Sequence, residues 1–212
     1  MPRYEWKTSD ESIVKAINGW EQTYAGVPVR WARESVDTLH YLADLALHEG
    51  AVARDHESHV VDVAHLRSAC GAAITALDLC GAALARRFKL RPNTLKGREF
   101  DLAAFDPDSA KKKTKKTARE GHVKALGHAA RRWVAETIAD TNYVKVKSFR
   151  NPLTHGIMFR HWYRGGTDDR VEFATPSKPH ESETSKSLVV AARDFAAARV
   201  EAFSLLVVGG EV

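Results

Sequence analysis

The sequence predicts an all-α protein, a bundle of helices with one small β-hairpin. Most of its 212 residues fall into segments in which apolar side chains recur every three or four positions, the period of an amphipathic helix. Glycines and prolines separate these segments and mark their ends. Hydrophobic residues make up 44% of the chain, which is enough to bury a sizeable core. We expect an N-terminal helical extension over residues 1–50 and a helical bundle over residues 51–212.

The predicted extension contains two helices. The first begins near Ser9 or Asp10 and presents an apolar face that ends at Trp20. The second spans residues 29–48, where apolar residues lie at helical intervals, and Gly50 follows as a stop signal.

The strongest helical pattern runs over residues 56–88 and predicts the central helix of the bundle. Its small residues, Gly71 and Gly81 among them, would let another helix approach closely. Asp78 is the one acidic residue within the apolar stretch of this helix. We expect it to face solvent, with a supporting role in a site as the alternative.

No disulfide, metal or cofactor is expected. Cys70 and Cys80 stand too far apart along one helix to bridge each other, so both are predicted to be buried free thiols. His56 and His59 could share a helix face, but no paired cysteines or His-Glu-x-x-His string accompanies them. The glycine-rich fingerprints of dinucleotide and nucleoside triphosphate sites are also missing.

The second half of the chain alternates between helical and irregular segments. Residues 89–108 show no period and predict a loop, and a single helix is predicted from Ser109 to Ile138. A shorter segment, residues 141–149, follows it. The pattern then predicts a β-hairpin from residues 157–163 and 170–175.

The last part of the chain predicts a polar connection followed by a helix. Residues 175–187 are rich in serine, threonine and proline and are expected to form a flexible connection. Residues 188–207 have the apolar spacing of a long terminal helix that closes the bundle.

Positive charge is concentrated between residues 111 and 150. Twelve Lys or Arg residues stand there against three acids, a local balance of +9 that exceeds the +5 of the whole chain. Such a stripe would hold a polyanion through its phosphates, and the alternative is an ordinary solvated face. The predicted RNA-binding residues are Lys111, Lys112, Lys113, Lys115 and Lys116.

The candidate catalytic residues are Arg150, Asn151 and His155, within the stretch Ser-Phe-Arg-Asn-Pro-Leu-Thr-His-Gly. An arginine supplies a permanent, forked positive charge suited to phosphate, and an imidazole can accept or donate a proton near neutral pH. Together they would suffice for RNA cleavage without a metal, in which the ribose 2′-hydroxyl attacks the neighbouring phosphorus. Asn151 adds a polar group that could orient either one.

The spacing of the motif predicts a break in the helix. Five positions along a regular helix turn a side chain by roughly 140°, so Arg150 and His155 would not share one face. Asn151 as N-cap and Pro152 at the first helical position predict a new helix start, with free N–H groups directed toward a bound anion.

The string formed by Arg150, Asn151, three further residues, His155 and Gly156 resembles the motif of the HEPN superfamily. The resemblance implies a helical ribonuclease, and one form that such a protein takes is the toxin of a toxin–antitoxin or phage-defence system. It also implies a homodimer with the site at the interface, and an antitoxin protein as a further partner. One HEPN toxin branch has a tyrosine two residues after the histidine, and Ile157 at this position argues against that branch.

The sequence leaves three functions open. The leading hypothesis is a metal-independent endoribonuclease, and the alternatives are a non-catalytic RNA- or nucleotide-binding module and a purely structural helical bundle. We expect a cytoplasmic protein that does not enter a membrane, because no apolar run approaches the roughly 20 residues of a membrane span and residues 1–7 lack the apolar core of a signal peptide.

Overall fold

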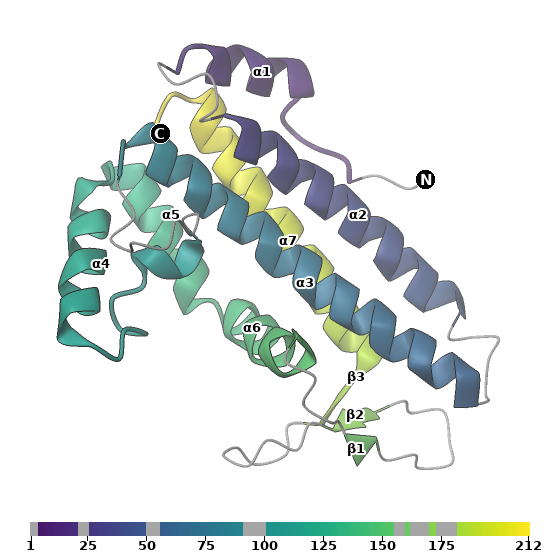
Figure 1. The fold of residues 1–212 in the computed structure, drawn as a ribbon. Coiled ribbons are helices and arrows are strands. Elements are labelled where there is room, and N and C mark those ends of the chain that lie inside the picture. Colours follow the sequence, from purple (N-terminus) through teal and green to yellow (C-terminus); the bar gives the residue numbers. More distant parts are fainter. Residues whose placement is uncertain are drawn as a thin grey trace.

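Helices make up most of the described part of the chain, which confirms the all-α prediction (Figure 1). The computed structural model describes residues 4–20, 26–49, 56–90, 101–154, 160–161, 170–172 and 182–212. In chain order the helical elements are α1 (Asp10–Asn18), α2 (Val27–Glu49), α3 (His56–Arg87), the 3-10 turn η1 (Leu102–Phe105), α4 (Lys113–Ala125), α5 (His128–Ala139), α6 (Thr141–Thr154) and α7 (Ser185–Val208).

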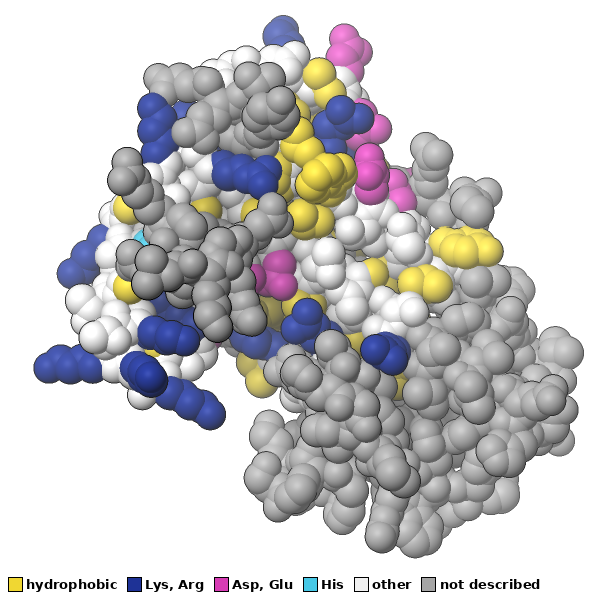
Figure 2. All heavy atoms as spheres, in the orientation of Figure 1, with side chains coloured by type: hydrophobic (Ala, Val, Ile, Leu, Met, Phe, Trp, Pro, Cys, Tyr) yellow, Lys and Arg dark blue, Asp and Glu magenta, His cyan; other side chains and the backbone are white. Residues whose placement is uncertain are grey.

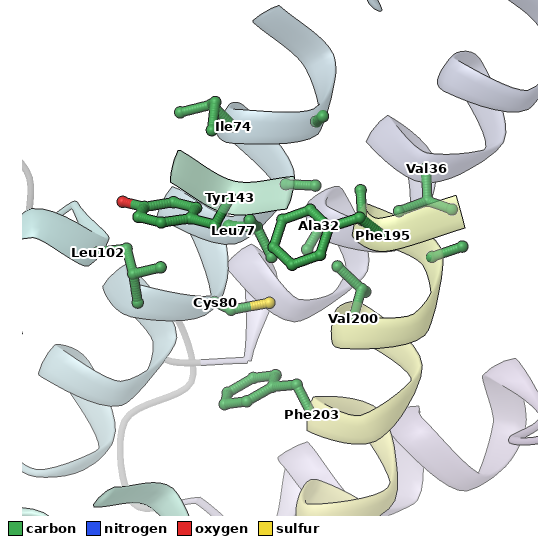
Figure 3. Close-up of a cluster of buried hydrophobic side chains, with 14 of the residues drawn as sticks. Ala32, Val36, Ile74, Leu77, Cys80, Leu102, Tyr143, Phe195, Val200 and Phe203 are labelled. Carbon is green, nitrogen blue, oxygen red and sulfur yellow. The ribbon is translucent and has the colours of Figure 1, made fainter. Parts of the chain in front are cut away.

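The long helices α2, α3 and α7 lie side by side and form the core of the bundle (Figure 1). They bury apolar residues at helical spacing, such as Val36 on α2, Leu77 on α3, and Val200 and Phe203 on α7 (Figure 3). Each such side chain stabilises the fold by about 1.5–3 kcal/mol when it is fully removed from water. Helix α3 is the central helix, as predicted, because it packs against α2, α6, α7 and η1.

The described part of residues 1–50, predicted as an extension, shares this core. Helix α2 packs along both α3 and α7. A buried polar network ties the segment before α1 to the bundle: the guanidinium of Arg33 donates to the hydroxyl and the carbonyl of Thr8 at 2.7 and 2.8 Å. Glu201 of α7 accepts from the Thr8 hydroxyl at 3.2 Å and from the Lys7 N–H at 3.1 Å.

The prediction of one helix from Ser109 to Ile138 is wrong, because the chain breaks at Leu126 and Gly127 into α4 and α5. Leu126 has extended backbone and a buried side chain, and Gly127 is the N-cap of α5. Arg131 donates to the carbonyls of Lys124 and Leu126, each at 3.1 Å, and so satisfies acceptors that the end of α4 leaves open. Burial of Leu126 and these bonds stabilise the turn.

The predicted loop of residues 89–108 contains the turn η1, which closes one side of the core. Leu102 and Phe105 are both fully buried, and α3 and α4 contact the turn. The Asp101 carboxylate caps it by accepting the N–H of Ala104 at 3.0 Å. An aspartate followed by two apolar residues three positions apart is the signal that sequence reasoning passed over.

A small sheet lies beside the start of α7 (Figure 1). Its strands pair antiparallel in the order β1 (Arg160–His161), β2 (Arg170–Glu172) and β3 (Ser182–Thr184). The turn of the predicted hairpin, residues 165–169, lies outside the described residues. Residues 182–184 were expected within a flexible connection, and that prediction is wrong for them because they pair with β2 and lead directly into α7.

Helix α3 buries both cysteines, as predicted. Burial raises the pKa of the Cys70 thiol to about 12 and also raises the pKa of Cys80, so neither forms a thiolate at neutral pH. Among the described helices, the segment Leu66–Arg87 is long and apolar enough to cross a membrane by length and composition, with a mean hydropathy of 1.5. The sequence was expected to contain no apolar segment of this length. However, 67% of the apolar stretch is buried inside the bundle, as in the core helix of a folded protein.

Gly81 lies where α3 meets η1, and a Cβ atom there would come within 2.9 Å of the Leu102 nitrogen. At Gly71 a Cβ would meet no atom within 4 Å. We predict that Gly81→Ala lowers the free energy of unfolding by about 1–3 kcal/mol, because the backbone of η1 must move. Gly71→Ala should raise it by up to about 1 kcal/mol, because alanine is the better helix former. Denaturant unfolding measures both, and a stabilising effect of Gly81→Ala would contradict the close contact.

Candidate functional site

Helix α6 positions Arg150 through the residues that precede it. Tyr143, Val146 and Phe149 recur every third position and are buried where α6 packs on α3 and α7. Arg150 follows Phe149 and is therefore rotated by about 100° from it, to the edge of the buried stripe. The arginine side chain is partly buried there. Core packing thus fixes the direction of the candidate catalytic cation.

The predicted helix start at Asn151 and Pro152 is wrong. Helix α6 runs without interruption through both residues to Thr154. Pro152 has no N–H to donate, so the helix lacks one bond to the carbonyl of Ser148 in its last described turn. The structure therefore places Arg150 and the backbone of Asn151, whereas His155 lies outside the described residues.

Asp78 of α3 lies at the junction of α3, η1 and α6, and not simply in solvent as expected. Its carboxylate accepts the N–H of Leu102 at 3.0 Å. The positive charges of Arg150 and Lys147 on α6 act on the same carboxylate. The junction thus brings Arg150 together with a carboxylate that is distant in sequence and with a second cation.

Burial of Asp78 changes the pKa of its carboxyl group more than its favourable contacts do. Loss of water raises the pKa of this carboxyl to about 6, and the negative charge of Asp101 raises it further. The Leu102 N–H, Arg150 and Lys147 oppose this rise without cancelling it. The ionised carboxylate therefore destabilises the fold at neutral pH, and its partners on α6 limit that cost.

Lys147 lies one helical turn before Arg150 and is held by Tyr143. Its ammonium donates to the Tyr143 hydroxyl at 3.2 Å and lies 4.9 Å from the centre of the ring. In Figure 3 the ring packs in the apolar cluster while its hydroxyl points away from it. Burial and the nearby carboxylates Asp78 and Asp106 raise the pKa of Tyr143, so the phenol stays neutral.

Sequence reasoning missed Lys147 and Tyr143 as members of this cluster, and it gave Asp78 a supporting role in a site only as the alternative to facing solvent. Two signals were present. Asp78 is a single acid in a long apolar helix, where a charge needs a partner. Residues 143, 147 and 150 have the four-and-three spacing that places side chains on one helix face.

The predicted RNA-binding lysines are all exposed at the start of α4. None of the thirteen residues of α4 is fully buried, and its first turn carries no acidic residue. Lysines there oppose the helix dipole, so they do not serve the stability of the helix. Lys116 pairs with Asp108 at 3.2 Å, an exposed contact of little energetic value.

Polar contacts, in place of a buried face, fasten α4 to η1. Arg119 donates to the carbonyl of Asp106 at 2.8 Å and to the hydroxyl of Ser109 at 2.5 Å. The Nδ1 atom of His122 lies 3.1 Å from the carbonyl oxygen of Ala104. In Figure 2, Lys and Arg side chains gather on one face over the lower end of α4 and over α6. Basic side chains of α4 and α6 therefore share a face of the molecule.

No group of three metal-ligating side chains occurs among the residues that the structure describes. The side chains of His56 and His59 lie outside that part of the chain. Comparison of the chain with family models, with curated proteins and with solved structures finds no match. The geometry of the α3–α6 junction is therefore the main guide to function.

We predict that Asp78→Asn stabilises the protein at pH 8 by at most about 3 kcal/mol, which corresponds to a pKa raised from 3.8 to about 6. The amide can still accept the Leu102 N–H but carries no buried charge. Because the folded-state pKa is the higher one, wild type regains this stability as the pH falls through 6 and approaches 3.8. The two proteins should thus differ little near pH 4.

Denaturant unfolding of both proteins between pH 4 and pH 8 measures the effect. A difference in stability that does not change over this range would show that the charge of Asp78 carries no cost.

Proposed function

We propose that this protein is a metal-independent endoribonuclease of the HEPN type, built on a HEPN-like helical bundle. The observation that carries the proposal is the position of Arg150, the first residue of the motif that includes His155. It lies on α6, which packs against α3, and its charge acts with that of Lys147 on Asp78. A perturbed carboxylate beside paired cations is typical of functional sites, because stability alone would not retain it.

Each residue of the motif has a defined role in the proposed reaction. The 2′-hydroxyl attacks the adjacent phosphorus and the bond from phosphorus to the 5′-oxygen breaks, which leaves a 2′,3′-cyclic phosphate and a 5′-hydroxyl. His155 moves a proton, from the attacking hydroxyl or to the leaving oxygen. Arg150 stabilises the charge that develops on the phosphoryl oxygens, and Asn151 orients either Arg150 or His155.

The lysines around the start of α4 would hold the RNA backbone near this motif. Phosphate contacts of this kind give affinity without reading sequence. In line with the HEPN resemblance, the proposal includes a homodimer whose two motifs form one site, and a role as a toxin or phage-defence component that an antitoxin restrains.

We predict that wild-type protein cleaves mixed cellular RNA in excess EDTA and that Arg150→Ala and His155→Ala each lower the rate at least about a hundredfold. The cleaved ends should carry 2′,3′-cyclic phosphate. A matched control is His128→Ala/Arg132→Ala, which removes an exposed histidine and an exposed arginine of α5 and should leave the rate unchanged. Thermal unfolding confirms that the variants fold.

The other two functions would give different results. If neither wild type nor variants cleave RNA while all bind it, the chain is a binding module. If RNA is neither cleaved nor bound, the bundle is structural and the motif is a coincidence.

We predict that removing charge around the start of α4 weakens RNA binding and lowers its salt dependence, because each phosphate contact to a single strand adds about 0.7 to the slope of log K against log salt. The variant replaces four exposed lysines by glutamine: Lys111, Lys112, Lys113 and Lys115. The control removes equal charge from exposed cations elsewhere: Lys7, Lys15, Arg30 and Arg67. Fluorescence titrations at several salt concentrations compare them, and equal slopes in both variants would rule out a specific role for α4.

A further inference from the structure

Helix α6 carries a polar ridge made of Tyr143, Lys147 and Arg150, which begins at Tyr143 of the buried stripe. The spacing of four and then three residues places these side chains on one face. Tyr143 is buried at the base of the ridge, and Lys147 and Arg150 are partly buried above it. The two cations therefore stand one helical turn apart, with Cβ atoms about 5–6 Å from each other.

Several contacts hold Lys147 in place. The Tyr143 hydroxyl accepts one N–H of the ammonium at 3.2 Å, and the ring lies under the charge at 4.9 Å. The Asp78 carboxylate, itself fixed by the Leu102 N–H at 3.0 Å, attracts Lys147 and Arg150 together. These contacts reduce the freedom that a surface lysine normally loses on binding, so the cation is preorganised for an anion.

This arrangement differs from that of the lysines around α4. Those side chains are exposed and bind phosphate as mobile point charges. Lys147 lies three residues before Arg150 on the same face of α6, so a phosphate group bound by one is within reach of the other. An ammonium has three N–H donors, and the bond to Tyr143 uses one of them.

We propose that Lys147 is a second phosphate-binding residue of the Arg150 site, and that Asp78 positions both cations so that they bind a single phosphodiester of an RNA strand. This inference rests on the proposed function for its substrate. It assigns the scissile phosphate to α6 and leaves the lysines of α4 to hold the flanking backbone.

The first experiment compares Lys147→Gln with Lys145→Gln, which removes the same charge two positions away, about 200° around α6. The probe is a random-sequence 2′-O-methyl RNA, which keeps the phosphates but lacks the attacking hydroxyl. Loss of a charge-assisted contact should weaken binding by Lys147→Gln about tenfold or more, while Lys145→Gln stays within about twofold of wild type. Equal weakening by both variants would overturn the proposal.

The second measurement follows the Asp78 carboxyl carbon by NMR as the pH changes. Removal of the Lys147 charge should raise the pKa of Asp78 relative to wild type, because a favourable partner of the carboxylate is lost. Lys145→Gln should leave that pKa unchanged. Identical titrations in all three proteins would show that Asp78 does not position Lys147 and would also overturn the proposal.

The two experiments separate this inference from the proposed function. If wild type fails to cleave RNA but Lys147→Gln alone loses binding, the phosphate site stands and the nuclease proposal fails. If wild type cleaves RNA and Lys147→Gln lowers the rate at saturating RNA while Lys145→Gln does not, both stand. If both variants cleave at the wild-type rate, Lys147 is not part of the site.

Discussion

Between Leu66 and Arg87, most side chains of helix α3 are apolar and Asp78 is the one acidic residue. Other elements must therefore cover most of the surface of this helix. Helices α2 and α7 cover part of its surface, and α6 and η1 cover the part that includes Asp78. The burial of α3 therefore fixes where α6 lies. Through Phe149, which is buried in the core, it also fixes the direction of Arg150.

The charge of Asp78 is difficult to explain by stability alone. An asparagine could also accept the Leu102 N–H, without the cost of a buried charge. What only a carboxylate supplies is electrostatic attraction for the charges of Lys147 and Arg150. Proteins commonly retain such costs where a site must be preorganised. The junction of α3 and α6 is therefore the part of the molecule that function, and not folding, accounts for best.

Local pattern was sufficient to predict the all-α class, the central helix α3, its buried cysteines and the terminal helix α7, because burial there follows the helical period. It failed where contacts between distant segments decide the structure. The break at Gly127 depends on the burial of Leu126, and α6 continues through Pro152 because its upstream stripe is fixed in the core. Of the site, the sequence identified the motif and gave Asp78 a supporting role only as the alternative, since the packing of α6 on α3 joins segments that are distant in sequence.

The central claim is that RNA is cut by its own 2′-hydroxyl at a phosphate held by α6. The most direct measurement uses a short RNA whose cleavage position has been mapped, with a single 2′-deoxy nucleotide placed at that position or, as a control, at its neighbour. We expect the first substrate to bind but not to be cut in EDTA, while the control is cut normally. Equal cleavage of both substrates would mean that water or another nucleophile attacks the phosphorus, and would contradict the account.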